Sequence, residues 1–221
     1  REHGGGRKRV SERHCEGPAG LLVVISGPSG VGKGAISRAL LERESNMRFS
    51  ISVTTRERRP NEREGVNYFF RTPEQFDAMV REEAFLEYTR VFGADWYGTP
   101  RAFVERQTGE GRDVILEIDV IGAQNVKRLY PEAVTVFIAP PSLTELRNRL
   151  TRRGTETREA LERRFETARE ELRILTHYDY LVVNDVLEQA IREVQAIILA
   201  EKRRICRSAY LFDKYLGGTD L

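Results

Sequence analysis

The sequence predicts an α/β fold in which a parallel β-sheet carries helices on both faces. Short continuous apolar runs, which are typical of strands buried on both sides, occur at residues 21–25, 114–118, 134–138 and 180–183. Between them lie longer stretches with apolar residues at helical spacing, and this alternation is the pattern of βαβ units. With 221 residues, 40% of them hydrophobic, the chain suits one compact domain or a core with small mobile appendages.

Composition and charge argue against several classes of protein. The net charge is only +2, from 36 basic and 34 acidic residues, so no global field demands a nucleic-acid partner. Cys15 and Cys206 lie near opposite ends without metal-ligand spacing, which indicates neither a disulfide framework nor a zinc site. No apolar run approaches the ~18–20 residues of a membrane span. We therefore expect a cytoplasmic protein that requires neither nucleic acid nor a membrane.

Residues 1–20 differ from the rest of the chain. They are rich in Gly and Arg and lack apolar periodicity, so they are expected to form a disordered basic tail. The cluster Arg7-Lys8-Arg9 could contact RNA or an acidic surface, although a solvated tail is the favoured interpretation of so short a run of charge.

A glycine-rich loop follows the first apolar run and precedes a stretch with Ile36, Leu40 and Leu41 at helical spacing. A polyphosphate needs several converging backbone N–H donors, and glycines allow the chain to wrap closely around it. The helix N-terminus adds a positive dipole end, and the lysine adds a charge for the β- and γ-phosphates. A chance turn containing Lys is disfavoured by the strand and helix on either side, so we predict a P-loop that binds a nucleoside triphosphate. The loop, which fits G-x-x-x-x-G-K, consists of Gly27, Pro28, Ser29, Gly30, Val31, Gly32 and Lys33.

The position after the P-loop lysine departs from the general pattern. A Ser or Thr there usually binds Mg²⁺ through its hydroxyl, but this chain has Gly34 followed by Ala35. Either Mg²⁺ is held mainly by phosphate oxygens, water and an acid such as Asp119, or the metal site is weakened. Because Mg²⁺ usually keeps several waters, the first alternative is credible.

A small α+β insertion is predicted from about residue 49 to residue 98. Short strand-like pieces (FSISV, NYFF and AFLEY) surround one helix, whose start is indicated by Thr72 as N-cap, Pro73 and Gln75. Arg56, Arg58 and Arg59 form an arginine run near the start of this insertion. Guanidinium groups suit a second phosphate, although such a run taken alone is more often a solvated loop.

The core pattern resumes at Thr99-Pro100, which is typical of an N-cap followed by a helix, here to about Thr108. The run at 114–118 ends in acids at Glu117 and Asp119, and Ser142 with Glu145 indicates a further capping box. Beyond it, arginines surround a polar Gly154-Thr155-Glu156 segment that could close over a nucleotide and neutralise charge growing on a transferred group. These arginines are Arg149, Arg152, Arg153 and Arg164.

At this point a resemblance to a known family is specific. The segments SGPSGVGKG, SVTTRERRPNEREGVNY, FLEY, WYGTP, ILEID, APPS, RRGTET with a later RRF, and VVND resemble guanylate kinases in the same order, over about residues 20–205. The resemblance implies a P-loop core of residues 21–48, 99–139 and 171–205, a GMP-binding subdomain of residues 49–98 and a short arginine-rich lid at 140–170. The role of residues 206–221 is left open. The resemblance to guanylate kinases also implies transfer of the ATP γ-phosphate to GMP in purine nucleotide metabolism, with Mg²⁺ as cofactor.

The resemblance also assigns roles to residues. The GMP phosphate would be held by Ser52, Arg56, Arg59, Tyr68 and Tyr97. Glu87 and Thr99 would read guanine, which offers N1–H and an exocyclic amine to a carboxylate where adenine presents a bare N1. Glu117 and Asp119 would lie near GMP and Mg²⁺, with Asp119 as the metal residue. ATP would bind residues 27–34, including Gly34, and Asn184 on the adenine side. The catalytic residues would be Lys33, Arg56, Arg149, Arg153 and Arg164.

Three alternatives remain open from sequence. Guanylate-kinase-like domains also serve as non-catalytic interaction modules, although these tend to lose the P-loop and arginine residues that this chain keeps. A kinase for another nucleotide is opposed by Glu87 and Thr99, and a P-loop switch or motor ATPase by the short insertion with its own phosphate cradle. The oligomeric state is not indicated.

Overall fold

The apolar run near the start of the chain becomes the central strand of a five-stranded parallel sheet. The computed structural model describes residues 19–91, 95–151, 158–208 and 215. The strand order is β2-β7-β1-β8-β9, and all four neighbouring pairs are parallel. These strands are β1 (Leu22–Ser26), β2 (Met47–Phe49), β7 (Asp113–Glu117), β8 (Val134–Ala139) and β9 (Tyr180–Val183). The four strands predicted from apolar runs are thus confirmed, within a residue or so at each end.

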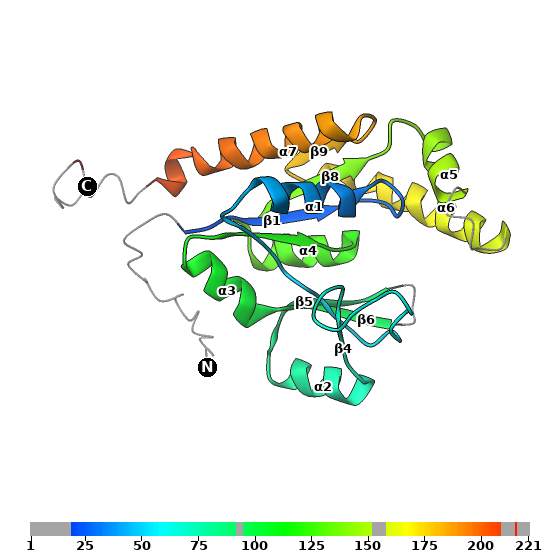
Figure 1. The fold of residues 1–221 in the computed structure, drawn as a ribbon, viewed down its shortest axis with the longest axis horizontal. Helices are drawn as coiled ribbons and strands as arrows, with labels where there is room; N and C mark the ends of the chain where they lie inside the picture. Colours follow the sequence, from blue (N-terminus) through cyan, green and yellow to red (C-terminus); the bar gives the residue numbers. More distant parts are fainter. Residues whose placement is uncertain (1–18, 92–94, 152–157, 209–214, 216–221) are drawn as a thin grey trace, which may run out of the picture.

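Alternate side chains of β1 enter two hydrophobic layers. Val23 and Ile25 pack on one face with α1 (Lys33–Arg43) and α7 (Leu187–Lys202). Leu22 and Val24 pack on the other face with α3 (Arg101–Gly109) and α4 (Val120–Leu129). Figure 1 shows these helix pairs on opposite sides of the sheet, which confirms the prediction of helices on both faces. The continuous apolar character of the strands follows from this double coverage.

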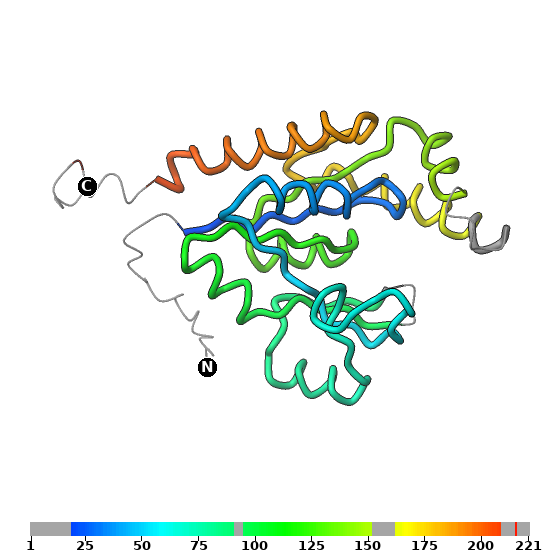
Figure 2. Tube along the Cα trace, in the orientation of Figure 1, coloured from blue at the N-terminus to red at the C-terminus, as the bar shows by residue number. Residues whose placement is uncertain are grey.

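A second, four-stranded sheet has the order β4-β3-β6-β5 and lies on the side of α3 and α4, away from α7 (Figure 2). It consists of β3 (Val53–Thr54), β4 (Phe69–Phe70), β5 (Phe85–Val91) and β6 (Asp95–Pro100), with α2 (Pro73–Arg81) beside it. The capping box that begins α2 is confirmed: Thr72 Oγ1 accepts from Gln75 N at 3.3 Å, and Thr72 N donates to Gln75 Oε1 at 3.0 Å.

Two local predictions were wrong. The segment FSISV is not one strand of the insertion, because Phe49 ends β2 in the parallel sheet while Val53 begins β3 in the small sheet. Thr99 is not an N-cap: it belongs to β6, its hydroxyl donates to Glu87, and Pro100 is the N-cap of α3. A strand hydrogen-bonded to β5 outweighed the local Thr-Pro signal at this position.

The remaining helices are α5 (Leu143–Thr151) and α6 (Arg158–Arg173), with short 3₁₀ turns η1 (Leu175–His177) and η2 (Ile205–Arg207). Ser142 Oγ accepts from Glu145 N at 3.1 Å, as expected for a cap at the start of α5. No helix within the described ranges is long and apolar enough to cross a membrane. The predicted tail at 1–20 falls outside the described residues except for Ala19 and Gly20.

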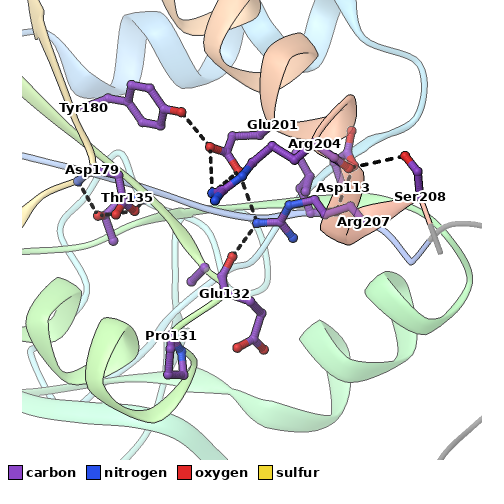
Figure 3. Close-up of polar contacts among 12 residues, drawn as sticks. Asp113, Pro131, Glu132, Thr135, Asp179, Tyr180, Glu201, Arg204, Arg207 and Ser208 are labelled. Carbon is purple, nitrogen blue, oxygen red and sulfur yellow. Dashed lines mark hydrogen bonds and ion pairs between the residues drawn. The ribbon is translucent and has the colours of Figure 1, made fainter. Parts of the chain in front are cut away.

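A polar cluster fixes the end of α7 to the sheet (Figure 3). Glu201 is only 4% exposed, and its Oε1 accepts from Tyr180 Oη at 2.6 Å. Arg207 Nη2 contacts both Glu201 Oε2, at 3.3 Å, and the Glu132 carbonyl, at 2.7 Å. Burial raises the pKa of Glu201, but the Tyr180 hydroxyl and the charges of Arg204 and Arg207 outweigh it and hold the pKa below its usual value.

Candidate functional site

A cavity of about 270 Å³ opens where the carboxyl ends of β1 and β7 face the small sheet. Ligands of open α/β sheets bind at this edge, because loops and helix N-termini converge there. The cavity brings together residues of both sheets and of α6. Its lining consists of Gly27, Ser29, Lys33, Ser52, Tyr68, Glu87, Thr89, Tyr97, Gly98, Glu117, Ile118, Asp119 and Glu171.

The loop between β1 and α1 has the backbone geometry of a phosphate cradle. Gly27 has a φ of 134°, and a Cβ there would lie 2.2 Å from the Ile138 carbonyl oxygen. Gly32, at φ 97°, is the left-handed N-cap of α1. Lys33 Nζ folds back over the loop and donates to the Gly27 carbonyl at 2.5 Å and to the Pro28 carbonyl at 3.1 Å. The loop thus presents backbone N–H groups, a helix N-terminus and an ammonium group to one space.

Asn184 supports this loop from behind. It follows β9, is 5% exposed, and its Nδ2 donates to the Val31 carbonyl at 2.7 Å. The backbone N–H of Asn184 donates to the Ala139 carbonyl at 2.8 Å, so the backbone at Asn184 is held against the end of β8. A Cβ on Gly32 would lie 2.4 Å from Asn184 Nδ2, which shows how closely the two segments pack.

Two acids, Glu117 and Asp119, line the cavity together with Lys33 of the glycine-rich loop. Asp119 Oδ1 caps α4 by accepting from Ile121 N and Gly122 N, each at 2.8 Å. Burial raises the pKa of Asp119, while these two hydrogen bonds and the charge of Lys33 oppose the rise. A Cβ at Gly34 would lie 3.5 Å from Glu117 Oε1, so the missing hydroxyl is not excluded by crowding.

Among the described residues, no group of three or more His, Cys, Asp or Glu side chains could hold a metal ion. The carboxylates of Glu117 and Asp119 line the cavity, and two carboxylates fit a hard cation that takes its other ligands from phosphate oxygens and water.

An arginine and two tyrosines form a second cradle. Arg56 Nε donates to Tyr97 Oη at 3.2 Å, and its guanidinium lies 5.5 Å from the centre of the Tyr68 ring. Ser52 lines the same cavity. Neither Arg56 nor Arg59 is among the residues that line the cavity, and the Arg59 side chain is exposed.

Glu62 is a residue of this cradle that the sequence reasoning missed. Arg56 Nη2 donates to its two carboxylate oxygens at 2.7 and 3.0 Å, and the Arg59 N–H donates to Oε2 at 2.9 Å. Both side chains of the Arg56–Glu62 pair are largely buried. Burial raises the pKa of Glu62. The hydrogen bonds and charges from Arg56 and Arg59 lower it by more, so the net pKa is below its usual value. An acid shortly after an arginine run was the available signal.

Glu87 is a buried acid of the small sheet with a strongly raised pKa. It is 5% exposed, and Oε1 accepts from Thr99 Oγ1 at 2.8 Å across the β5–β6 pair. Oε2 is buried and has no hydrogen-bond partner among the described residues. Burial raises the pKa of Glu87 to about 7, the Thr99 hydrogen bond lowers it, and the Asp119 charge raises it. A buried, half-satisfied carboxylate at a cavity is suited to a ligand with N–H donors.

An arginine of α5 contacts Asn184, and an arginine of α6 contacts the loop between β1 and α1. Arg149 Nη1 donates to the Asn184 carbonyl at 2.9 Å, and its Nε donates to Glu145 Oε1 at 2.8 Å. Arg164 Nη2 donates to Ser29 Oγ at 2.6 Å. Arg153, predicted with them, lies outside the described residues.

Glu171 was also missed. It lies seven residues after Arg164 on α6, hence on the same helix face, and lines the cavity. Burial raises its pKa to about 7, with Lys33 lowering and Asp119 raising it. The i, i+7 spacing from Arg164 was a readable signal.

Comparisons with known proteins agree on one family. The family model described as guanylate kinase matches residues 20–201. A protein of Caldanaerobacter subterraneus subsp. tengcongensis named guanylate kinase is 50% identical over 195 residues, covering 88% of this chain and 94% of that protein. One of Symbiobacterium thermophilum with the same name is 50% identical over 191 residues, covering 86% and 90%. The crystal structure of guanylate kinase from Anaplasma phagocytophilum matches with a TM-score of 0.75 at 31% identity, covering 92% of this chain and 98% of that one.

Proposed function

The chain belongs to the guanylate kinase family and is an ATP:GMP phosphotransferase, and on this premise we propose how its own residues divide the work. The observation that carries the proposal is the shared cavity: a phosphate loop and a buried, half-satisfied carboxylate open onto the same space. This arrangement suits a donor phosphate chain on one side and a purine with N–H donors on the other.

On the ATP side, we propose that residues 27–34 bind the phosphates through backbone N–H groups, with Lys33 on the β- and γ-phosphates. The loop is held in shape by its glycines and by the hydrogen bond from Asn184 to Val31. We propose that Asn184 also borders the adenine side, next to this contact.

On the GMP side, Glu87 and Thr99 are proposed to read guanine. Glu87 Oε2 would accept from guanine N1–H and the exocyclic amine, while Thr99 keeps Oε1 occupied. Adenine would leave that buried oxygen facing a bare ring nitrogen, which is a strong penalty. The phosphate of GMP is assigned to Ser52, Arg56, Arg59, Tyr68 and Tyr97, with Arg59 required to move inward from its exposed position.

We propose Mg²⁺ as the cation, with Asp119 and Glu117 beside it. When bound, Mg²⁺ would supply positive charge that offsets the phosphate oxygens of ATP. The lack of a hydroxyl at Gly34 and Ala35 is compatible with a cation that keeps several waters.

Phosphoryl transfer here needs no general base. The GMP phosphate is already anionic near neutral pH, since a phosphate monoester has its second pKa near ~6. The protein's work is to align two phosphates in line, shield their charge and exclude water. Lys33, Arg56, Arg149, Arg153 and Arg164 are proposed to supply the charge. A cytoplasmic role in purine nucleotide metabolism follows as part of the same proposal.

The test is ADP release from Mg-ATP with GMP, AMP, UMP or no acceptor. We expect rapid turnover with GMP alone, and Glu87→Gln should lose this selectivity while still binding ATP. Comparable turnover with AMP and GMP in the unmodified protein, or unchanged GMP kinetics in Glu87→Gln, would contradict the assignment of guanine recognition.

A further inference from the structure

The Glu87 carboxylate lies against α4, a helix that packs on the five-stranded sheet. Figure 1 shows α4 between the five-stranded sheet and β5, and Ala123 and Val126 of α4 share a hydrophobic cluster with Leu86 of β5. Gly122 is buried at this interface, in the first turn of α4. Glu87 is the neighbour of Leu86 on β5 and points its carboxylate at Gly122.

The space at position 122 is filled by that carboxylate. A Cβ built on Gly122 would lie 3.1 Å from Glu87 Oε2 and 3.4 Å from Ile118 Cδ1. The first distance is tighter than nine in ten contacts of real Cβ atoms, so Oε2 would have to move by a few tenths of an ångström. The oxygen displaced is the one without a partner, whereas Oε1 is held by Thr99.

Neither backbone geometry nor hydrogen bonding explains the glycine at this position. Gly122 is helical and is absent from the residues with positive φ. Its N–H donates to Asp119 Oδ1 at 2.8 Å, a contact that any residue except proline would make. Alanine is more favourable than glycine in a helix, so the glycine makes α4 less stable. This cost suggests that the missing methyl group serves the site instead.

We infer that Gly122 is a specificity-determining residue, which leaves Glu87 Oε2 in position to accept guanine N–H groups. This rests on the proposed role of Glu87. Gly122 acts through Glu87 and is a positioning residue. A hydrogen bond to a charged group is sensitive to small displacements, so adding one methyl group should weaken guanine recognition while leaving ATP binding intact.

The test compares Gly122→Ala with Gly109→Ala. Gly109 is also the glycine of a helix, but a Cβ there meets nothing within 4 Å, so it provides the same chemical change without the contact. We expect Gly122→Ala to raise KM for GMP about tenfold, to narrow the preference for GMP over AMP by a similar factor, and to leave KM for ATP unchanged. Gly109→Ala should keep the parental values.

Melting temperatures separate positioning from packing. Without nucleotide, Gly122→Ala should melt within ~3 °C of the parent or above it, because the helix gain offsets the contact. The rise in Tm caused by GMP should shrink, whereas the rise caused by ATP should not. A large fall in Tm without nucleotide would assign the glycine to packing and overturn the inference.

A double-mutant cycle tests the contact itself. Glu87→Asp withdraws the carboxylate by one methylene, so Gly122→Ala should change KM for GMP less than about threefold in that background. An equal loss in both backgrounds, or a parental KM in Gly122→Ala, would overturn the inference. If instead Glu87→Gln itself keeps normal GMP kinetics, the proposed role of Glu87 fails first.

Discussion

Replacing Glu87 by Gln should lower the activity toward GMP and raise the stability of the empty protein, and the gain in stability should increase with pH. The structure buries this carboxyl group, raises its pKa from 4.5 to about 7 and leaves one oxygen without a partner. In the unfolded chain the group loses its proton near pH 4.5, whereas in the folded, empty protein it keeps the proton to about pH 7. Unfolding therefore releases a proton between these values.

The sign and size follow from linkage. Because the unfolded state binds fewer protons in this window, the free energy of unfolding falls as pH rises from 4.5 to about 7, and it levels off above that. A pKa displaced that far corresponds to about 3 kcal/mol. Gln carries no titrating proton. The free energy of unfolding of Glu87→Gln, taken relative to that of the parent, should therefore rise by about 3 kcal/mol as the pH increases from 5 to 8. The buried amide has its own unfavourable energy, which is the same at both pH values and cancels.

Thermal unfolding without nucleotide measures this difference. For a chain of this size, about 3 kcal/mol corresponds to roughly 6–12 °C in Tm, so the Tm of Glu87→Gln minus that of the parent should rise by that amount from pH 5 to pH 8. Glu82→Gln, on an exposed side chain of the same small unit, is the matched control and should follow the parent. Glu171 titrates in both proteins and cancels from the difference, whereas the Asp119 charge is part of what raises the pKa of Glu87 and so belongs to the measured effect.

The same substitution should lower kcat/KM for GMP by about 100-fold at pH 8, because an amide N–H cannot accept from guanine and a charged hydrogen bond contributes about 1.5–3 kcal/mol. Parallel Tm profiles of the two proteins from pH 5 to pH 8 would refute the electrostatic reasoning. Stability gained without any loss in GMP kinetics would refute the recognition role alone.

Three further outcomes are expected. Lys33→Ala should lower kcat by about 10²–10³-fold, since it removes charge from the transferring group, while calorimetry should show unchanged GMP affinity. Asn184→Ala leaves the buried Val31 carbonyl unpaired, so KM for ATP should rise about tenfold and GMP affinity should not change; the reverse pattern would contradict its place under the phosphate loop. Glu62→Gln removes the charge that orients Arg56, and KM for GMP should rise several-fold in steady-state assays with KM for ATP as the internal control.

Much of the fold was readable from local pattern. The four apolar runs became parallel strands, since a strand buried on both faces needs no polar alternation. The capping box at Thr72 was predicted correctly because both of its hydrogen bonds lie within four residues. The same local logic failed at Thr99, where pairing with β5 decided the conformation, and it missed β6 altogether.

The sequence alone therefore determined the glycine-rich loop, the alternation of buried parallel strands with helices, and the family to which its motifs belong. Only the tertiary structure decided which residues meet: Asn184 under the loop 153 residues earlier in the chain, and Gly122 against Glu87. The physical reason is that hydrophobic periodicity and capping act over a few residues and leave a mark in the sequence. A contact between distant segments depends on how whole sheets and helices pack, and a glycine that leaves space for a carboxylate carries no local signal.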